Sequence, residues 1–325
     1  MRSVIVVVHP HRQDALLAAR DVCFSLHAEG IRPLMSAKHL RALEAATGAS
    51  PVPIALLGSE QGEGFQGGND TSSANVQAAS VADCELVIVL GGDGTLLKAA
   101  ERFHRSGIPI VGINLGHIGF LAESEREDLR EAVTRVAAGD YTVEKRMALD
   151  VTVTTDTKVI HKTWAFNEAT VEKGEGSRMI ELVTGIDSRP VSTFGCDGVI
   201  LASPTGSTAY AFSAGGPIVW PDVEALLMVP ISAHALFAEP LVISPDSRLA
   251  VEFPASQTDT HAVLWCDGRR ELDLPPGARV EVERAASPVA LVRINTTSFT
   301  ERLVAKFHLP VQGWRGPKTQ GADND

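Results

Sequence analysis

The chain has 325 residues, enough for two domains, and 44% of them are hydrophobic, enough for packed cores. Its formal net charge of −11 opposes long-range attraction to phosphate backbones and anionic lipids, so we expect neither nucleic acid nor a membrane as partner. No apolar run reaches the roughly 18–20 residues of a membrane helix. The four cysteines lack zinc or CxxC spacing, so we expect a cytoplasmic protein with reduced thiols.

The first part of the chain alternates strand and helix patterns. Apolar, mostly β-branched runs at 3–8, 84–90 and 108–116 predict strands buried on both faces. Apolar residues at helical spacing predict helices over 12–30, 95–107 and 124–140, the last capped by Ser124. Because strands alternate with helices, we expect an α/β domain with a parallel, Rossmann-like sheet.

A polar, Gly/Ser/Asn-rich stretch at 58–77 interrupts this pattern and predicts a loop. It contains GEGFQG at 62–67, which matches the spacing GxGxxG. A dinucleotide-binding fingerprint needs a helix directly after these glycines, and the sequence GNDTSS that follows is not helical. We therefore interpret the match as part of the loop.

After about residue 141 the pattern changes to short, often alternating runs separated by turns, which is typical of antiparallel β-structure. One short helix-like patch at 208–216 interrupts these runs. We expect an α/β domain over 1–144, then an all-β, sandwich-like domain over 145–313 whose last part is free to pack back on the first. The polar residues 314–325 predict a disordered tail.

The sequence GGDGT at 91–95 lies between a predicted buried strand and a predicted helix. Ligands of open α/β sheets bind at this edge, and glycines with free N–H groups at a helix start favour an anion. A carboxylate there repels phosphate, so Asp93 needs a compensating role, such as accepting a proton or acting through a divalent metal. The alternative is that Asp-Gly simply forms a tight turn.

Two later stretches also concentrate polar groups. In PTGSTAY, at 204–210, hydroxyls and backbone donors meet at a helix start, where they either cap that helix or bind a ligand close to the backbone. Asn167 and Glu168 are neighbours in a strand-like run and point to opposite faces unless the strand bends or ends there. Taken alone, this pair fits an exposed surface better than a site.

Together, GGDGT, the Asn167–Glu168 pair, the DG at 197–198 and SPTGSTAY at 203–210 resemble the ATP-NAD kinase family, as do NLGHIGFLAE and EKRMALDV. The match runs from about Val4 to Trp314. The GGDGT loop is shared with diacylglycerol kinases and phosphofructokinases, whereas the other motifs are more specific. The resemblance implies a kinase of NADP biosynthesis that transfers the γ-phosphoryl of ATP, or polyphosphate in some members, to the 2′-hydroxyl of the adenosine ribose of NAD.

The resemblance also implies site residues, an active site in the crevice between the two domains, Mg²⁺ arriving with ATP, and a homodimer or homotetramer. Asp93 would act on the 2′-hydroxyl as base or orienter. The implied phosphate-binding residues are Gly91, Gly92, Gly94, Thr95 and Lys98. The implied NAD-binding residues are Asp93, Gly94, Phe120, Asn167, Glu168, Arg178, Asp197, Thr205, Ser207, Thr208, Ala209, Tyr210 and Ser213.

The chain departs from the family pattern in three places. Gly195 and Cys196 precede the DG aspartate where many members carry a basic residue, so Arg178 becomes one candidate partner for the new 2′-phosphate. Glu239 replaces a frequent arginine, and Arg269 replaces a frequent glutamine after the later DG. Two alternatives remain beside the kinase: a lipid kinase that shares only GGDGT, and an NAD(H)-binding sensor without catalysis.

Overall fold

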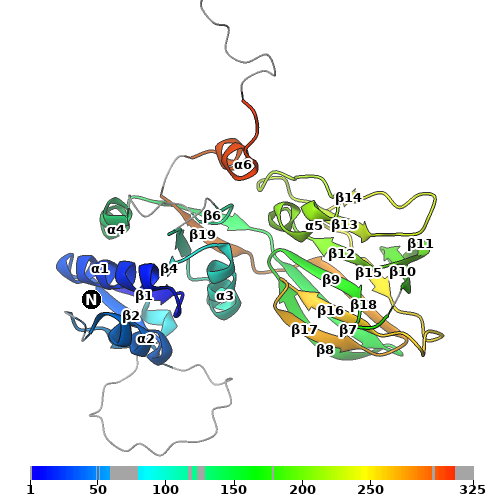
Figure 1. The fold of residues 1–325 in the computed structure, drawn as a ribbon, viewed down its shortest axis with the longest axis horizontal. Coiled ribbons are helices and arrows are strands. Elements are labelled where there is room, and N and C mark those ends of the chain that lie inside the picture. Colours follow the sequence, from blue (N-terminus) through cyan, green and yellow to red (C-terminus); the bar gives the residue numbers. More distant parts are fainter. Residues whose placement is uncertain are drawn as a thin grey trace, which may run out of the picture. The chain divides into compact units, whose positions relative to one another are not determined.

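The computed structural model describes residues 2–48, 50, 52–58, 80–115, 119–122, 129–177, 179–294 and 297–311. They form two compact units (Figure 1). Within the described ranges, the first unit comprises Met1–Ala99, Ile108–Val143 and Val292–Asp325, and the second comprises Ala100–Gly107 and Glu144–Leu291. No helix in these ranges is both long enough and apolar enough to cross a membrane.

A seven-stranded sheet organises the first unit, in the order β3-β2-β1-β4-β5-β19-β6. The neighbours from β3 to β5 pair in parallel, as the sequence predicts. Every residue of β1 and β4 is buried, which confirms the expectation of strands covered on both faces. The strands are β1 Ser3–Val8, β2 Arg32–Met35, β3 Ala55–Leu56, β4 Leu86–Leu90, β5 Ile110–Ile113, β6 Thr142–Arg146 and β19 Val289–Arg293.

Helices cover this sheet. The first, α1, contacts α2, α4 and the strands β1, β2 and β4, and its apolar side chains join those of the sheet in one core. The sequence patterns did not single out β2, α2 or α6, although Ser36 caps α2 by accepting the N–H of His39. The helices with residues in the first unit are α1 Gln13–Ala28, α2 Ala37–Thr47, α3 Asp93–Phe103, α4 Leu129–Ala138 and α6 Phe299–Phe307.

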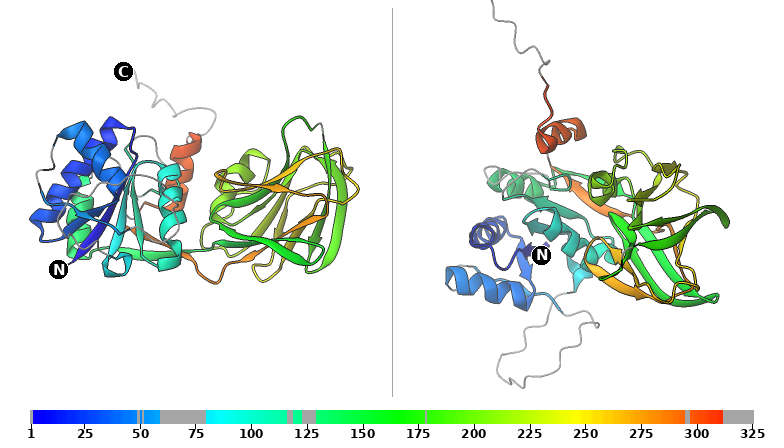
Figure 2. Two further views of the ribbon diagram at one scale, coloured as in Figure 1. Left: turned by 90° about the horizontal axis from the view of Figure 1, so that it is seen from below. Right: turned by 45° about the vertical axis from the view of Figure 1, so that its right-hand side comes forward.

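Two six-stranded antiparallel sheets form the second unit (Figure 2). Their orders are β11-β10-β15-β18-β7-β8 and β14-β13-β12-β9-β16-β17. The bounds are β7 Leu149–Thr155, β8 Lys158–Ala165, β9 Glu168–Lys173, β10 Ile180–Ile186, β11 Arg189–Cys196, β12 Gly198–Ala202, β13 Leu226–Ile231, β14 Leu241–Ile243, β15 Leu249–Glu252, β16 Ala262–Cys266, β17 Arg270–Leu274 and β18 Ala278–Arg284.

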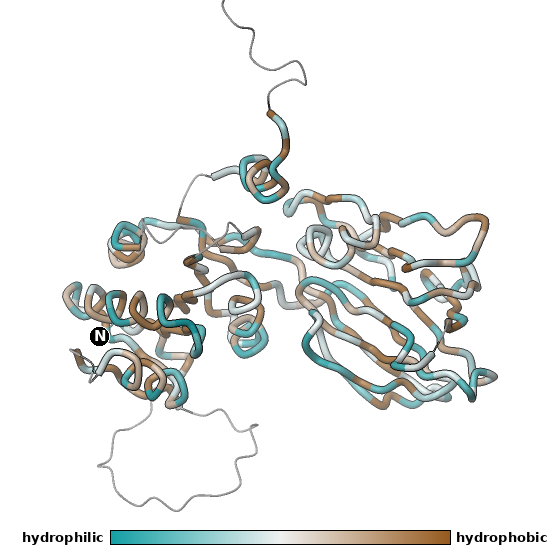
Figure 3. The backbone as a smooth tube through the Cα atoms, in the orientation of Figure 1, coloured by the Kyte–Doolittle hydropathy of each residue, from teal (hydrophilic) through white to brown (hydrophobic). Residues whose placement is uncertain are grey.

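Both sheets of the second unit contribute to one core. Val151 and Leu182 come from one sheet, and Val171 and Leu264 come from the other. Figure 3 shows apolar residues, in brown, along the strands and polar residues, in teal, in many of the turns. The sandwich-like fold expected for this part is therefore confirmed. The short helix-like patch is a single helical turn at Thr205–Thr208 followed by α5, Tyr210–Ser213.

Several predicted features lie outside the described residues. They are the Ser124 cap, the loop at 58–77 apart from Gly58, and the tail at 314–325. Arg178, the candidate phosphate partner, also lies outside them.

Candidate active site

The glycine corner after β4 is tighter than the sequence pattern suggests. Helix α3 begins at Asp93, not near Thr95, so Asp93 occupies the first turn of the helix. Gly91 has a φ of 150°, and a Cβ there would lie 2.6 Å from the hydroxyl oxygen of Thr95. Only glycine fits this position. A carboxylate at a helix start is stabilised by the helix dipole.

The loop after β5 holds the Asp93 carboxylate. Its Oδ2 accepts the N–H of Phe120 at 3.1 Å, and its Oδ1 accepts the N–H of Leu121 at 3.2 Å. A Cβ on Gly119 would lie 2.3 Å from Oδ1, so only a glycine lets this loop approach the carboxylate. These contacts orient Asp93 while its side chain stays half-buried rather than enclosed.

Helix α6 supports the same loop. The buried Arg302 donates from Nη1 to the carbonyl oxygen of Phe120 at 3.2 Å. The ring of Phe120 lies 5.8 Å from that of Phe299 and 5.7 Å from that of Phe307, measured between centroids. The side chain of Phe120, expected to wall the pocket, is therefore packed among aromatic rings and 8% exposed. No sequence signal pointed to α6 as a neighbour of the GGDGT loop.

The backbone next to Asp93 is open. A Cβ on Gly92 or Gly94 would meet no atom within 4 Å, so space exists beside both residues. Lys98 is exposed on α3, and its charge, after the effect of burial, lowers the pKa of His9. His9 follows β1, and its N–H bonds to the carbonyl of Leu90 at 3.3 Å. Lys98 and His9 thus place positive or protonatable groups at the carboxyl edge of the sheet.

In the second unit, the chain bends at Asn167. Strand β8 ends at Ala165 and β9 begins at Glu168, so the pair is not in one continuous strand. The Asn167 and Glu168 residues are only 9% and 5% exposed. The interpretation of the pair as an exposed surface is therefore wrong, because both residues are buried at the bend.

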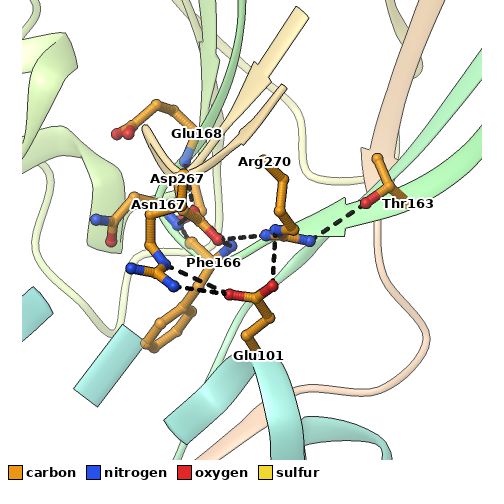
Figure 4. Close-up of polar contacts among 9 residues, drawn as sticks. Glu101, Thr163, Phe166, Asn167, Glu168, Asp267 and Arg270 are labelled. Carbon is orange, nitrogen blue, oxygen red and sulfur yellow. Dashed lines mark hydrogen bonds and ion pairs between the residues drawn. The ribbon is translucent and has the colours of Figure 1, made fainter. Parts of the chain in front are cut away.

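A third segment caps this bend (Figure 4). Asp267, in the turn between β16 and β17, accepts the N–H groups of Phe166 at 2.9 Å and Asn167 at 2.7 Å through Oδ1. Oδ1 also accepts the N–H of Glu168 at 3.4 Å. Burial raises the pKa of Asp267, and these donors partly offset the rise. The sequence marked an Asp-Gly turn here, but not its contact with the Asn167 bend.

Glu168 is a buried carboxyl whose pKa is strongly raised. Burial, followed by the charge of Asp267, raises its pKa to about 8, and the backbone N–H of Tyr210 partly offsets this. Within the described residues, its Oε2 has no hydrogen-bond partner. Figure 4 shows the carboxyl directed away from Arg270 and Glu101. A buried acceptor without a partner is suited to bind a hydroxyl of a ligand.

The SPTGSTAY segment packs directly on the bend. Ser203 donates its hydroxyl to the carbonyl of Phe166 at 2.6 Å and its N–H to the carbonyl of Asn167 at 2.9 Å. A Cβ on Gly206 would lie 2.1 Å from the Asn167 carbonyl oxygen. The glycine therefore permits this contact between two segments that are distant in sequence.

We expect Gly206→Ala to lower the free energy of unfolding by roughly 3 kcal/mol, because the new methyl group must displace backbone. Urea denaturation measures the change. The matched control is Gly185→Ala, whose Cβ would lie 3.2 Å from the Arg189 carbonyl oxygen and should cost less. Equal urea midpoints for Gly206→Ala and the unchanged chain would contradict the close approach.

The hydroxyls of PTGSTAY divide into two groups. Ser207 Oγ donates to the Pro204 carbonyl at 2.6 Å and accepts the Val219 N–H at 2.9 Å, and Thr208 Oγ1 donates to the Thr205 carbonyl at 3.3 Å. These two hydroxyls stabilise the local fold. The buried Thr205 Oγ1 has no hydrogen-bond partner among the described residues.

Asp197 lies at the junction of β11 and β12 and is paired with Lys173. The distance from Lys173 Nζ to Asp197 Oδ1 is 2.6 Å, and this hydrogen bond lowers the pKa of Asp197. The side chains of Tyr210 and Glu172 are hydrogen-bonded to each other, and burial raises the pKa of both groups. Ala209 precedes α5 and Ser213 ends it at an exposed position.

A glycine corner at the carboxyl edge of a parallel sheet, followed by a helix start, is the arrangement of a nucleotide-binding protein. Residues 4–141 match the ATP-NAD kinase N-terminal domain, and residues 166–294 match the ATP-NAD kinase C-terminal domain. The chain therefore belongs to the ATP-NAD kinase family, as the resemblance implied.

Relatives match over nearly the whole length. NAD kinase 2 of Streptomyces coelicolor is 52% identical over 318 residues, with 97% of each chain covered. NAD kinase of Thermobifida fusca is 51% identical over 319 residues, which cover 97% of this chain and 92% of the relative.

Solved structures share the fold at 22% sequence identity. Yeast NADH kinase complexed with NADH superimposes with a TM-score of 0.81, covering 96% of this chain and 89% of that chain. An NAD kinase from Archaeoglobus fulgidus in complex with ATP superimposes with a TM-score of 0.67, covering 95% and 99%.

Proposed function

We infer that this chain is an ATP-dependent NAD kinase, which transfers the γ-phosphoryl group of ATP to the 2′-hydroxyl of the adenosine ribose of NAD and produces NADP. The observation that best supports this function is the 52% identity to an NAD kinase over 97% of the chain. The lipid-kinase alternative, based on the GGDGT loop alone, does not account for the C-terminal domain match at 166–294.

Asp93 is the proposed catalytic residue. Its carboxylate takes the proton of the 2′-hydroxyl, or orients that hydroxyl, as the 2′-oxygen bonds to the γ-phosphorus. The bond from this phosphorus to the bridging β–γ oxygen breaks, and ADP leaves. The N–H groups of Phe120 and Leu121 support this role because they fix the carboxylate before substrate binds.

The proposed phosphate site comprises the N-terminal end of α3 and its flanking glycines, namely Gly91, Gly92, Gly94, Thr95 and Lys98. Open space beside Gly92 and Gly94 supports close approach of an anion to the backbone. We propose that Mg²⁺ arrives with ATP, since Mg²⁺ is commonly held by substrate phosphates and one or two carboxylates. In the described part of the chain, no group of three or more His, Cys, Asp or Glu side chains is arranged to hold a metal ion by itself.

The proposed NAD site lies along the bend and the SPTGSTAY segment. Its residues are Asn167, Glu168, Asp197, Thr205, Ser207, Thr208, Ala209, Tyr210 and Ser213, with Phe120 and Arg178 as further candidates. Asn167 and Glu168 would hold the adenosine end, and Asp197 would lie near the nicotinamide end. Because the Ser207 and Thr208 hydroxyls are used within the fold, we propose that their segment binds NAD mainly through backbone groups.

The test is an assay of the purified chain with two donors and two acceptors: ATP or polyphosphate, and NAD or NADH, each with Mg²⁺. We expect NADP from ATP and NAD, and loss of product when EDTA removes the metal. Binding of NAD without phosphorylation under every combination would instead identify a non-catalytic sensor.

We also propose that the chain forms a homo-oligomer in the cytoplasm. All four cysteines are free thiols, which suits a reducing compartment. Phe237 is 73% exposed, and Leu236, Val242 and Val191 are also exposed. Exposed apolar side chains of this kind commonly lie in an interface between subunits. Light scattering of the chain and of Phe237→Ser would test this.

A further inference from the structure

The geometry points to Asp267 as a positioning residue for NAD binding: its carboxylate fixes the Asn167–Glu168 bend, and Arg270, held by Glu101, fixes the carboxylate. This inference rests on the proposed function, because it takes Asn167 and Glu168 as residues that bind NAD.

The backbone donors of the bend converge on one carboxylate. Its N–H groups at Phe166, Asn167 and Glu168 all face Asp267, and the Asp267 N–H donates back to the Glu168 carbonyl at 2.9 Å. A carboxylate that accepts several backbone N–H groups fixes their directions together. The Asn167 and Glu168 side chains project from this backbone. Their positions therefore depend on Asp267.

Arg270 holds the Asp267 carboxylate in turn. Its Nη2 donates to Asp267 Oδ2 at 2.7 Å, and its Nη1 donates to Thr163 Oγ1 at 3.2 Å (Figure 4). Its guanidinium carbon lies 5.0 Å from the centroid of the Trp164 ring. His104 stacks on Trp164, with ring centroids 3.7 Å apart. The guanidinium plane is therefore restrained by two hydrogen bonds and an aromatic face.

Glu101 on α3 completes the arrangement. Its Oε2 lies 3.4 Å from Arg269 Nε, and its Oε1 lies 3.9 Å from Arg270 Nε. Arg269 is thus paired with Glu101. The Glu101 carboxylate therefore lies between Arg269 and Arg270, the residue that contacts Asp267.

Asp267 also affects the charge of Glu168. The groups facing Glu168 are Asp267 from the β16–β17 turn, Glu172 from its own strand and the Tyr210 N–H from α5. Burial raises the pKa of Glu168 most, the charges of Asp267 and Glu172 raise it further, and the Tyr210 N–H lowers it. Removing the Asp267 charge should therefore lower the pKa of Glu168, an effect that loosened packing alone would not produce.

The decisive variant is Asp267→Asn. We expect the KM for NAD to rise roughly tenfold with kcat changed less than about threefold, because the bend loosens but Asp93 is untouched. The limb of the kcat/KM profile that reports Glu168 should move to lower pH by roughly one unit. Arg270→Lys keeps the positive charge, so it should raise the KM for NAD without moving that limb.

The matched control is Glu283→Gln. It removes one carboxylate from the exposed Arg248–Glu283 pair of the same unit and should leave KM, kcat and the pH profile unchanged. If Asp267→Asn only lowers the melting temperature, with KM and pH profile unchanged, Asp267 is merely structural and the inference is overturned. If Asp267→Asn fails to fold, Arg270→Lys decides: a wild-type KM for NAD overturns the inference.

A substrate-free measurement separates this inference from the proposed function. Hydrogen exchange of the amides at 166–168 should be faster in folded Asp267→Asn or Arg270→Lys than in the unchanged chain, whichever reaction the protein catalyses. Unchanged exchange at these amides contradicts the positioning role, whereas absence of NADP formation by the unchanged chain contradicts only the kinase assignment.

Discussion

Asp93→Asn lowers kcat for NADP formation by roughly a thousandfold or more, with little change in the KM for NAD. Asparagine has the same shape and retains an oxygen that can accept the N–H of Phe120 or Leu121, but it cannot take a proton from the 2′-hydroxyl. The fold should therefore persist while the chemical step fails. Initial rates with ATP and NAD, with melting curves to check folding, measure the effect.

The matched control for this variant is Asp83→Asn, which changes an exposed aspartate of the first unit just before β4. It should have the kinetics of the unchanged chain. Undiminished NADP formation by Asp93→Asn would show that another group acts on the hydroxyl.

Glu168→Gln makes the protein more stable at alkaline pH, and the gain disappears in acid. The folded carboxyl titrates near 8, raised by burial and then by Asp267, whereas its ordinary pKa is 4.5. Between these values the folded chain keeps a proton that the unfolded chain has lost, so raising the pH favours unfolding. Glutamine is neutral throughout and removes this dependence.

The size of the effect follows from the shift. At about 1.4 kcal/mol per pKa unit, the full shift corresponds to at most roughly 5 kcal/mol, and we expect ~2 kcal/mol because buried sites relax and admit water. Urea denaturation from pH 4.5 to 9 should show a difference that grows up to about pH 8. Glu271→Gln, an exposed change on β17, should match the unchanged chain at every pH. A constant difference for Glu168→Gln would exclude a raised pKa.

Local patterns predicted the elements whose signal is contained in a short stretch of chain. The apolar runs of β1 and β4 require burial on both faces, and the apolar spacing of α1 requires one buried face. By contrast, β2 has only four residues, and α6 binds its neighbours through the buried Arg302, a residue type usually exposed. Such elements depend on neighbours that the local pattern does not contain.

The motifs identified candidate site residues but not the residues that hold them in position. Asp93 was recognisable in GGDGT, whereas its partner Phe120 lies 27 residues further along the chain. Asp267 lies 101 residues from Phe166 and belongs to an Asp-Gly turn that could equally have been an ordinary hairpin. Spacing along the sequence carries no signal for contacts of this range.

By itself, the sequence determined the two-part architecture through its buried strands and amphipathic helices, and it implied the family and the reaction through the resemblance of its motifs. These signals are all local or ordered along the chain. The tertiary structure alone decided that Asn167 and Glu168 lie on a buried bend, that Asp267 caps it, and that Glu168 titrates near 8. The physical reason is that the pKa of a carboxyl depends on exclusion of water and on nearby charges, which only the folded chain brings together.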